Sequence, residues 1–126
     1  MSVTGTAHWP VEIRLKRAEK TLEIAFEDGT RFRLPAEYLR VESPSAEVQG
    51  HGPGQKTLVH GRAAVGIIAV EPVGNYAVRL VFDDLHDTGI YSWTYLYELG
   101  REQERRWTDY LTALAAAGLS REAKRG

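Results

Sequence analysis

The stretch VEIRLKRAEKTLEIAFEDGTRFRL, residues 11–34, decides the fold class because apolar and polar residues alternate along it. This period of two is typical of strands that bury one face. The apolar positions are Val11, Ile13 and Leu15, then Leu22, Ile24 and Phe26, then Phe32 and Leu34. Residues 18–20 would turn the chain once, and Asp28-Gly29 is a strong hairpin signal because glycine accepts a positive φ. The stretch therefore predicts an antiparallel meander of three strands.

Two more strands and a short helix are predicted beyond the meander. Pro35 can open a helix over residues 36–40, since the first helical turn does not need its N–H. Residues 65–73 form an apolar run rich in β-branched side chains. Gly74-Asn75 can turn this run into a further alternating stretch, residues 76–82, which completes a second hairpin.

The C-terminal part of the chain carries a helical pattern from Trp93 to Ala117. Ser92 is suited to cap its start, and Gly118 is suited to end it. Gly100 weakens the helix, so we expect a kink or a break there. The residues expected to form the buried stripe of this segment are Trp107, Leu111 and Leu114.

Strands that precede one long helical segment indicate an α+β fold and not alternating βαβ units. We predict an antiparallel-dominated sheet with a short helix and a long C-terminal helical segment packed on one face. With 126 residues, the chain is expected to form a single domain over 1–126. Its core would span about 9–119, with loose ends at 1–8 and 120–126.

The composition excludes several classes of function. Sixteen basic and seventeen acidic side chains give a net charge of −1, so no nucleic-acid partner is expected. The absence of cysteine excludes disulfides, cysteine nucleophiles and thiolate metal ligands. No apolar run reaches the ~18 residues of a membrane span, and residues 1–7 lack a signal-peptide pattern. We therefore expect a cytoplasmic protein with no membrane partner.

A glycine-rich stretch, GHGPGQKT at residues 50–57, nearly matches a phosphate-binding loop. Gln55 stands where that motif requires the glycine before the lysine, and no strong buried strand precedes the stretch. We interpret it as a surface loop, followed by a short strand over residues 56–59. The sequence contains no Gly-x-Ser-x-Gly, which gives no support to a hydrolase of that type.

An acidic turn follows the last predicted strand and leaves two interpretations open. Asp84, His86 and Asp87, with Asp83 beside them, offer carboxylate and imidazole groups that could bind iron, manganese or zinc. The alternative is a solvated turn in which His86 bonds to the backbone. The nearby aromatic residues Tyr91 and Tyr95 are equally open, since they could form an exposed patch for a protein partner or pack on the sheet.

Three segments together resemble one family. They are LRVESPSAEVQGHGPGQ at residues 39–55, VEPVGNYAVRLVFDDLHDTGIYSW at 70–93 and YLYELG at 95–100. These segments are similar to the gamma-butyrobetaine hydroxylase-like N-terminal domain family, a domain of unknown function, in its small stand-alone bacterial form. The resemblance extends over residues 9–115 or so.

The resemblance implies two contexts for such a domain. In carnitine-pathway oxygenases, it precedes the catalytic domain and binds a structural zinc through a Cys-x-Cys-x-x-Cys cluster and a later histidine. Those positions fall on Ser43, Ser45, Val48 and His86, of which only the histidine is a good zinc ligand. The oxygenase catalytic domain has no counterpart here. In the second context, similar domains are fused to ATPases of iron–sulfur cluster delivery.

The same resemblance implies that His86 lies near Ser43 and Ser45, and that the glycine loop with His51 lies close by. We therefore predict one shared surface of this group with Asp84 and Asp87. The alternative is a vestigial site in which His86 is buried, hydrogen-bonded and needed for packing.

These observations predict a non-enzymatic accessory or adaptor domain, linked to iron–sulfur cluster or iron metabolism. Its expected partner is a protein, with an iron–sulfur assembly ATPase as the first candidate, and the expected partner surface comprises Ser43, Ser45, His51, Tyr91 and Tyr95. No cofactor is expected in this interpretation. The alternative is a metal-binding protein that holds iron or zinc through His86, Asp84 and Asp87. A third class is a small enzyme with its site between the glycine loop and the acidic turn.

Overall fold

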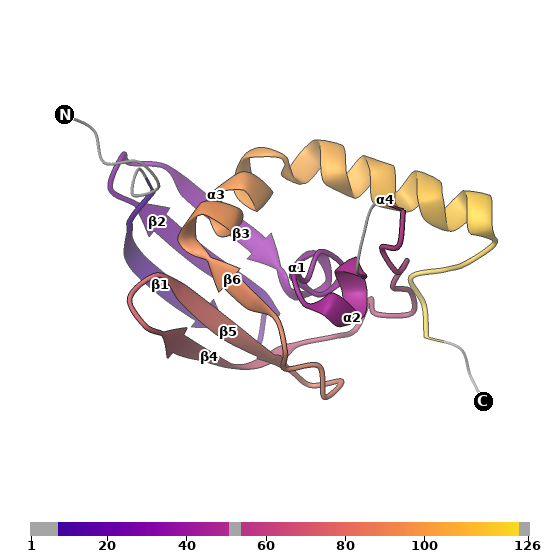
Figure 1. Cartoon of the computed structure of the whole chain (residues 1–126), viewed down its shortest axis with the longest axis horizontal. Helices are drawn as coiled ribbons and strands as arrows, with labels where there is room; N and C mark the ends of the chain where they lie inside the picture. Colours follow the sequence, from indigo (N-terminus) through magenta and orange to yellow (C-terminus); the bar gives the residue numbers. More distant parts are fainter. Residues whose placement is uncertain (1–7, 51–53, 124–126) are drawn as a thin grey trace.

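The first half of the chain forms a three-stranded antiparallel sheet. A computed structural model describes residues 8–50 and 54–123. Its strands β1 (Pro10–Lys16), β2 (Thr21–Phe26) and β3 (Arg31–Pro35) pair in the order β1-β2-β3 (Figure 1). The predicted meander is therefore confirmed.

The remaining strands form a second three-stranded sheet instead of extending the first. Strands β4 (Ile67–Val73), β5 (Ala77–Phe82) and β6 (Ile90–Ser92) pair antiparallel in the order β4-β5-β6. The predicted hairpin of β4 and β5 is present. β6 was not predicted, because three residues carry too little periodicity to indicate a strand.

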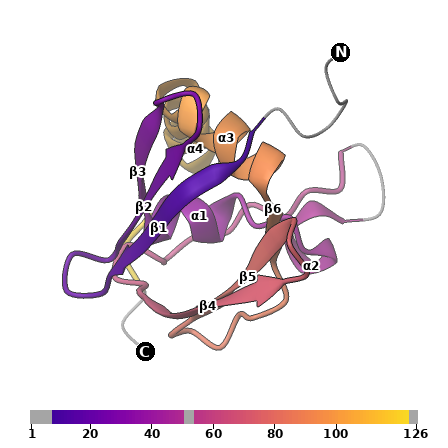
Figure 2. The same ribbon diagram turned by 90° about the vertical axis from the view of Figure 1, so that its left-hand side faces the viewer.

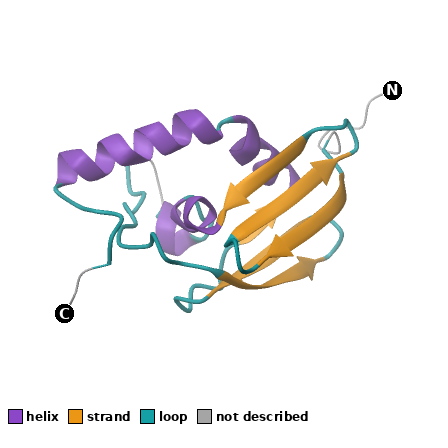
Figure 3. Cartoon of the chain, turned by 180° about the vertical axis from the view of Figure 1, so that it is seen from behind, coloured by secondary structure: helices purple, strands orange, loops and turns teal. Residues whose placement is uncertain are grey.

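Four helices complete the α+β fold. They are α1 (Ala36–Val41), α2 (Ala46–Gln49), α3 (Trp93–Arg101) and α4 (Gln103–Ala117). Figure 3 shows the strands gathered on one side of the molecule, with α4 extending beyond them. The prediction of antiparallel strands with a short helix and a long C-terminal helical segment is confirmed.

The predicted ends of the C-terminal helical segment are also confirmed. The Ser92 side chain accepts a hydrogen bond from the backbone N–H of Tyr95, at 3.1 Å, and so caps α3. Gly118 ends α4 in the left-handed conformation, which glycine adopts without strain. The expected break falls at Glu102, two residues after Gly100.

A single core joins both sheets to α1 and α3. Figure 2 shows α1 behind the opening between the two sheets, and Figure 1 shows that it lies at their end, directly after β3. The large core side chains of the strands are Leu22, Ile24, Phe26, Leu34, Leu80, Phe82 and Tyr91, and those of the helices are Tyr38, Leu39, Leu96 and Leu99. Because α1 contributes Tyr38 and Leu39 to the core that both sheets share, the residues that follow α1 lie close to the loop that joins β5 and β6.

Helix α4 packs away from the sheets and its buried stripe differs from the predicted one. Tyr110 and Leu114 contact Val41 and Val48 in a smaller apolar cluster beside α1 and α2. Leu111 is 40% exposed, so its predicted burial is wrong. The helix turns Tyr110 toward the cluster, which places the next residue at the edge of the buried stripe.

Two local predictions about strands are wrong. A β-bulge between Pro10 and Glu12 inserts Val11 as an extra residue and leaves it 63% exposed, although alternation placed it with the buried residues. Residues 56–59 form no strand. The backbone N–H of Thr57 donates to the carbonyl of Val48 instead, which ties this segment to α2.

Within the described residues, no helix is long and apolar enough to cross a membrane.

Candidate functional site

Two serines and a histidine meet in the interior, at the positions where the family resemblance placed them. The Ser43 Oγ lies 2.9 Å from the Nε2 of His86, and the Ser45 Oγ lies 3.4 Å from the same nitrogen. Ser43 is fully buried and His86 is 6% exposed. We call Ser43, Ser45 and His86 the serine–histidine cluster. The predicted proximity of these three residues is confirmed, whereas the prediction that they lie on a surface is wrong.

Local structure explains how the serine–histidine cluster forms. Ser43 follows the end of α1, and Ser45 occupies the position before the first residue of α2. His86 comes from the loop between β5 and β6. That loop approaches closely because Gly89 has no side chain: a Cβ there would lie 2.6 Å from the Ser43 Oγ. Glycine is therefore required where the loop passes the serine.

An ion-paired carboxylate fixes the adjoining turn, residues 83–87, which we call the acidic turn. The Asp84 Oδ2 accepts a hydrogen bond from the Nε of Arg40 at 2.8 Å and forms an ion pair of the same length with Arg62. The Asp84 Oδ1 accepts the backbone N–H of His86 at 3.1 Å. One carboxylate thus holds α1, the segment before β4 and the turn together.

The electrostatic environment sets the charge of both groups. Burial lowers the pKa of His86, and the positive charge of Arg40 lowers it further, so the imidazole is held in its neutral form. Burial alone would raise the pKa of Asp84, but its hydrogen bonds from Arg40 and the His86 backbone outweigh burial and leave this pKa lowered. A neutral histidine therefore lies beside an ionised aspartate.

The residues present do not fit the zinc that the resemblance implies. Val48, which takes the place of the third cysteine, is buried and has no donor atom. The two serine hydroxyls are hydrogen-bonded to the single histidine. Over the described part of the chain, no three His, Asp or Glu side chains come together as a metal site would require.

The carboxylates of the predicted metal site have other partners. Asp84 is paired with Arg40 and Arg62, as described above. The Asp87 carboxylate lies 3.5 Å from the Nη1 of Arg79 and is exposed. The structure thus places Asp84 and Asp87 on different arginines and does not bring them together around His86.

The two tyrosines predicted for a partner surface differ in their placement. Tyr91 is fully buried in the core, and its hydroxyl donates to the carbonyl of Leu39 at 2.5 Å, so it is not a surface residue. Tyr95 is half-buried, and its hydroxyl donates to the carbonyl of Glu42. Both side chains support packing. His51 lies outside the described residues.

A serine–histidine hydrogen bond is also the first contact of a hydrolytic dyad, but its surroundings here do not suit catalysis. The Ser43 hydroxyl is inaccessible to a substrate. On the far side of the ring, the Oε1 of Glu47 lies 3.9 Å from the Nδ1 of His86. That distance exceeds a hydrogen bond, so Glu47 does not orient the imidazole as the third member of a catalytic triad would.

Sequence reasoning missed three charged residues, two in α1 and one directly after it, that are buried and paired with distant segments. Glu37 accepts two hydrogen bonds from Arg121, at 2.7 and 2.9 Å. Arg40 pairs with Asp84, and Glu42 pairs with Lys56 and Arg106 at 2.9 and 3.0 Å. The charges were visible in the sequence, but their partners lie 14 to 84 positions away, and no local pattern indicates such pairs.

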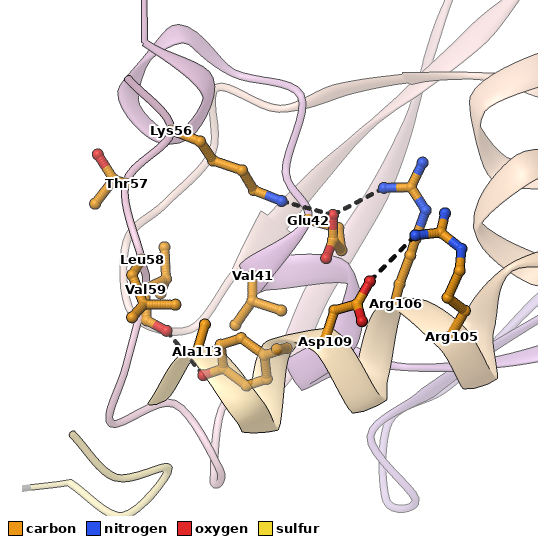
Figure 4. A pocket seen from close by; sticks show the side chains of 11 residues that line it. Val41, Glu42, Lys56, Thr57, Leu58, Val59, Arg105, Arg106, Asp109 and Ala113 are labelled. Carbon is orange, nitrogen blue, oxygen red and sulfur yellow. Dashed lines mark hydrogen bonds and ion pairs between the residues drawn. The ribbon is translucent and has the colours of Figure 1, made fainter. Parts of the chain in front are cut away.

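A hollow between α4 and residues 56–59 is an alternative to the buried cluster as a site near α1. It has a volume of about 440 Å³ and is lined by Val41, Tyr110 and several charged groups (Figure 4). Lys56 and Arg106 point toward Glu42, while Arg105 pairs with Asp109 (Figure 4). Each of these three cations already has a carboxylate partner, so the side chains that line the hollow offer no unpaired charge to a ligand.

Comparisons with known proteins identify a matching family and three solved structures that are similar to this chain. A family model described as "Gamma-butyrobetaine hydroxylase-like, N-terminal" matches residues 13–97. Two proteins known from NMR solution structures are 48% and 49% identical to the chain, with TM-scores of 0.81 and 0.82. The first match covers 94% of both chains, and the second covers 99% of this chain and 93% of the other.

A third structure comes from Acidithiobacillus ferrooxidans ATCC 23270. It is a crystal structure of a protein with unknown function that belongs to the DUF971 family. It is 41% identical over 72% of this chain and 91% of the other, with a TM-score of 0.61. No curated protein matches the chain at a significant level.

Proposed function

Because the chain belongs to the family of gamma-butyrobetaine hydroxylase-like N-terminal domains, we propose that it acts as a non-enzymatic adaptor that binds another protein. One observation carries this proposal: the serine–histidine cluster is buried and hydrogen-bonded within itself. Its polar groups stabilise the arrangement of α1, α2 and the acidic turn, and they have no free position for a substrate. Because these groups are engaged in stabilising the fold, we expect the domain to act through its surface.

The family context suggests the kind of partner. The resemblance to domains fused to ATPases of iron–sulfur cluster delivery makes such an ATPase the first partner to test. A domain that is fused to its partner in one chain can bind that partner as a separate chain in another. This argument rests on how domains are combined in related chains and not on the geometry of the site, so the partner must be identified by experiment.

Metal binding through His86, Asp84 and Asp87 is the weaker alternative. A metal would have to take Asp84 away from two arginines and take the His86 Nε2 away from two hydroxyls. Each exchange would leave buried polar groups without partners, which is costly.

A binding experiment tests the adaptor proposal. The tagged chain is used to recover proteins from an extract of the source cells, and each recovered protein, together with the iron–sulfur ATPase, is then purified and titrated with the chain by calorimetry. We expect one protein to bind saturably, at about micromolar dissociation constant or tighter. An unrelated tagged domain of similar size and charge is the control. If no purified protein binds saturably, the adaptor proposal is wrong.

A further inference from the structure

Leu85, in the acidic turn, is the most exposed of the large apolar side chains that the structure describes. It is 87% exposed, whereas the core side chains around the base of the turn are buried. The loop that carries it extends from the end of the second sheet, on the side away from α4 (Figure 1). Single exposed apolar residues are common, so exposure alone does not indicate a function.

The backbone at Leu85 adds a second, independent observation. Its φ is +74°, in the left-handed region that disfavours residues with a Cβ. The Leu85 N–H donates to the Phe82 carbonyl, and the Phe82 N–H donates to the His86 carbonyl. In such three-residue loops, the third position takes the left-handed conformation and usually holds glycine. A leucine at this position strains the backbone, and its exposed side chain gives the fold little burial in return.

The base of the turn holds this leucine in a fixed place. The Asp83 N–H donates to the Gly66 carbonyl at 2.9 Å. Asp84 is anchored by two arginines, and His86 is anchored by the serine–histidine cluster. The residues next to Leu85, which are Asp83, Asp84 and His86, are thus each hydrogen-bonded or ion-paired to another part of the fold. A backbone that is already fixed before binding loses little conformational entropy when the side chain that it carries binds a partner.

Exposed carboxylates lie on both sides of the leucine in the sequence. Asp83 and Asp87 flank it in the acidic turn, and Asp87 also pairs with Arg79 at 3.5 Å. Glu47, from α2, is exposed as well, and it accepts a hydrogen bond from the hydroxyl of Thr88 just beyond the turn. Within the described residues, Asp83 and Glu47 form no ion pair with a lysine or arginine, so a partner for this surface must combine an apolar pocket with a basic rim.

We propose that Leu85 is the anchor through which the domain docks on its protein partner, by inserting into an apolar pocket that is edged by lysine or arginine side chains. This inference rests on the adaptor function proposed above and assigns it to a site. The acidic residues around Leu85 speed the encounter with a basic surface, and the leucine supplies the buried contact that slows dissociation.

Leu85→Gly tests the anchor. Glycine removes the side chain and is compatible with the left-handed backbone, so the variant should melt at the same temperature as the wild-type protein or higher. Against the purified partner from the experiment above, we expect its dissociation constant to rise about 30-fold, the loss that is typical when a hot-spot residue is removed. Val11→Ala is the matched control, because it trims another exposed apolar residue, which lies in strand β1 and not in the acidic turn.

A charge variant tests the basic rim. Asp83→Lys should slow association with the partner several-fold, and the affinity of the wild-type protein should decrease with added salt. If the partner binds the wild-type protein but Leu85→Gly binds it equally well, the anchor is wrong and the adaptor function stands. If Leu85→Gly and Val11→Ala weaken binding equally, the anchor is also wrong. If no partner binds the wild-type protein, both proposals fail.

Discussion

His86 links the buried and the exposed parts of the candidate site, because its ring belongs to the serine–histidine cluster and its backbone closes the acidic turn. The ring contacts Ser43 and Ser45, and the His86 N–H donates to Asp84. Removal of the ring would take this hydrogen-bond partner away from both buried hydroxyls and open a cavity. Its role is therefore structural, and it acts on the surface only through the turn that it fixes.

His86→Ala should lower the free energy of unfolding by about 1–3 kcal/mol at neutral pH. It should also remove one component of the pH dependence. The pKa of His86 lies below its ordinary value of 6.5 in the folded protein, so the unfolded chain binds more protons just below that pH. Wild-type stability should consequently fall as the pH drops below about 6.5. Urea denaturation at several pH values measures both effects.

Asp87→Ala is the control for this prediction, since its exposed carboxylate should change stability by less than about 0.5 kcal/mol. The lowered pKa of Asp84 affects stability in a separate, more acidic pH range. Its contribution to the free energy of unfolding is lost only as the pH falls below the ordinary value of 3.8. A His86→Ala variant as stable as the wild-type protein at neutral pH, with the same pH profile above pH 5, would contradict a structural role for the ring.

At the scale of secondary-structure elements, α3 approaches β3 closely at Gly100. Gly100 lies in the last turn of α3, and a Cβ at this position would lie 2.3 Å from the ring of Phe32. Glycine in a helix ordinarily costs stability relative to alanine. Here its lack of a side chain allows the helix to pack on the strand, and the break expected at this position follows immediately.

Gly100→Ala should therefore destabilise the protein by about 1–3 kcal/mol, although alanine favours helices. The measurement is thermal or urea unfolding of the single variant, of Phe32→Ala and of the double variant. The double variant should lose less stability than the sum of the two single losses, because Phe32→Ala makes room for the new methyl group. Stabilisation by Gly100→Ala alone would mean that α3 and β3 are further apart.

The local elements could be predicted from the sequence, whereas their packing could not. Alternation and turn residues indicated β1 to β3, and Ser92 and Gly118 indicated the ends of the C-terminal helical segment. The bulge at Val11 and the division into two sheets depend on contacts between distant segments. The same holds for Leu111, since the partner of α4 decides which of its residues are buried.

The candidate site could be predicted in part, and only through the family resemblance. The proximity of Ser43 and His86 followed from the positions of the family's ligands and not from the periodicity of the sequence. Burial could not be predicted, because it results from the packing of α1 into the core at the end of the two sheets. Nothing in the sequence pattern marked the left-handed backbone of Leu85, because that position usually holds glycine.

At the scale of the whole molecule, α1 and its C-cap residue Glu42 connect otherwise separate segments through ion pairs in which their own side chains are buried. Glu37 holds Arg121 near the C-terminus, Arg40 holds the acidic turn, and Glu42 binds both residues 56–59 and α4 through Lys56 and Arg106. Removal of one partner from such a pair is costly, because it leaves the buried charge of the other partner uncompensated. The fold is thus held together by apolar packing and side-chain pairs at the place where the resemblance implies a zinc.

We infer that the domain is stabilised by its own side chains and acts through its surface. Calorimetric melting of the purified protein tests this claim most directly, with and without a strong chelator and alongside a measurement of metal content. Because Ser43, Ser45 and Val48 cannot replace three thiolates, we expect less than one metal ion per ten chains and a melting temperature that shifts by less than about 1 °C. A stoichiometric metal ion, and a melting temperature that falls by about 5 °C or more with chelator, would contradict it.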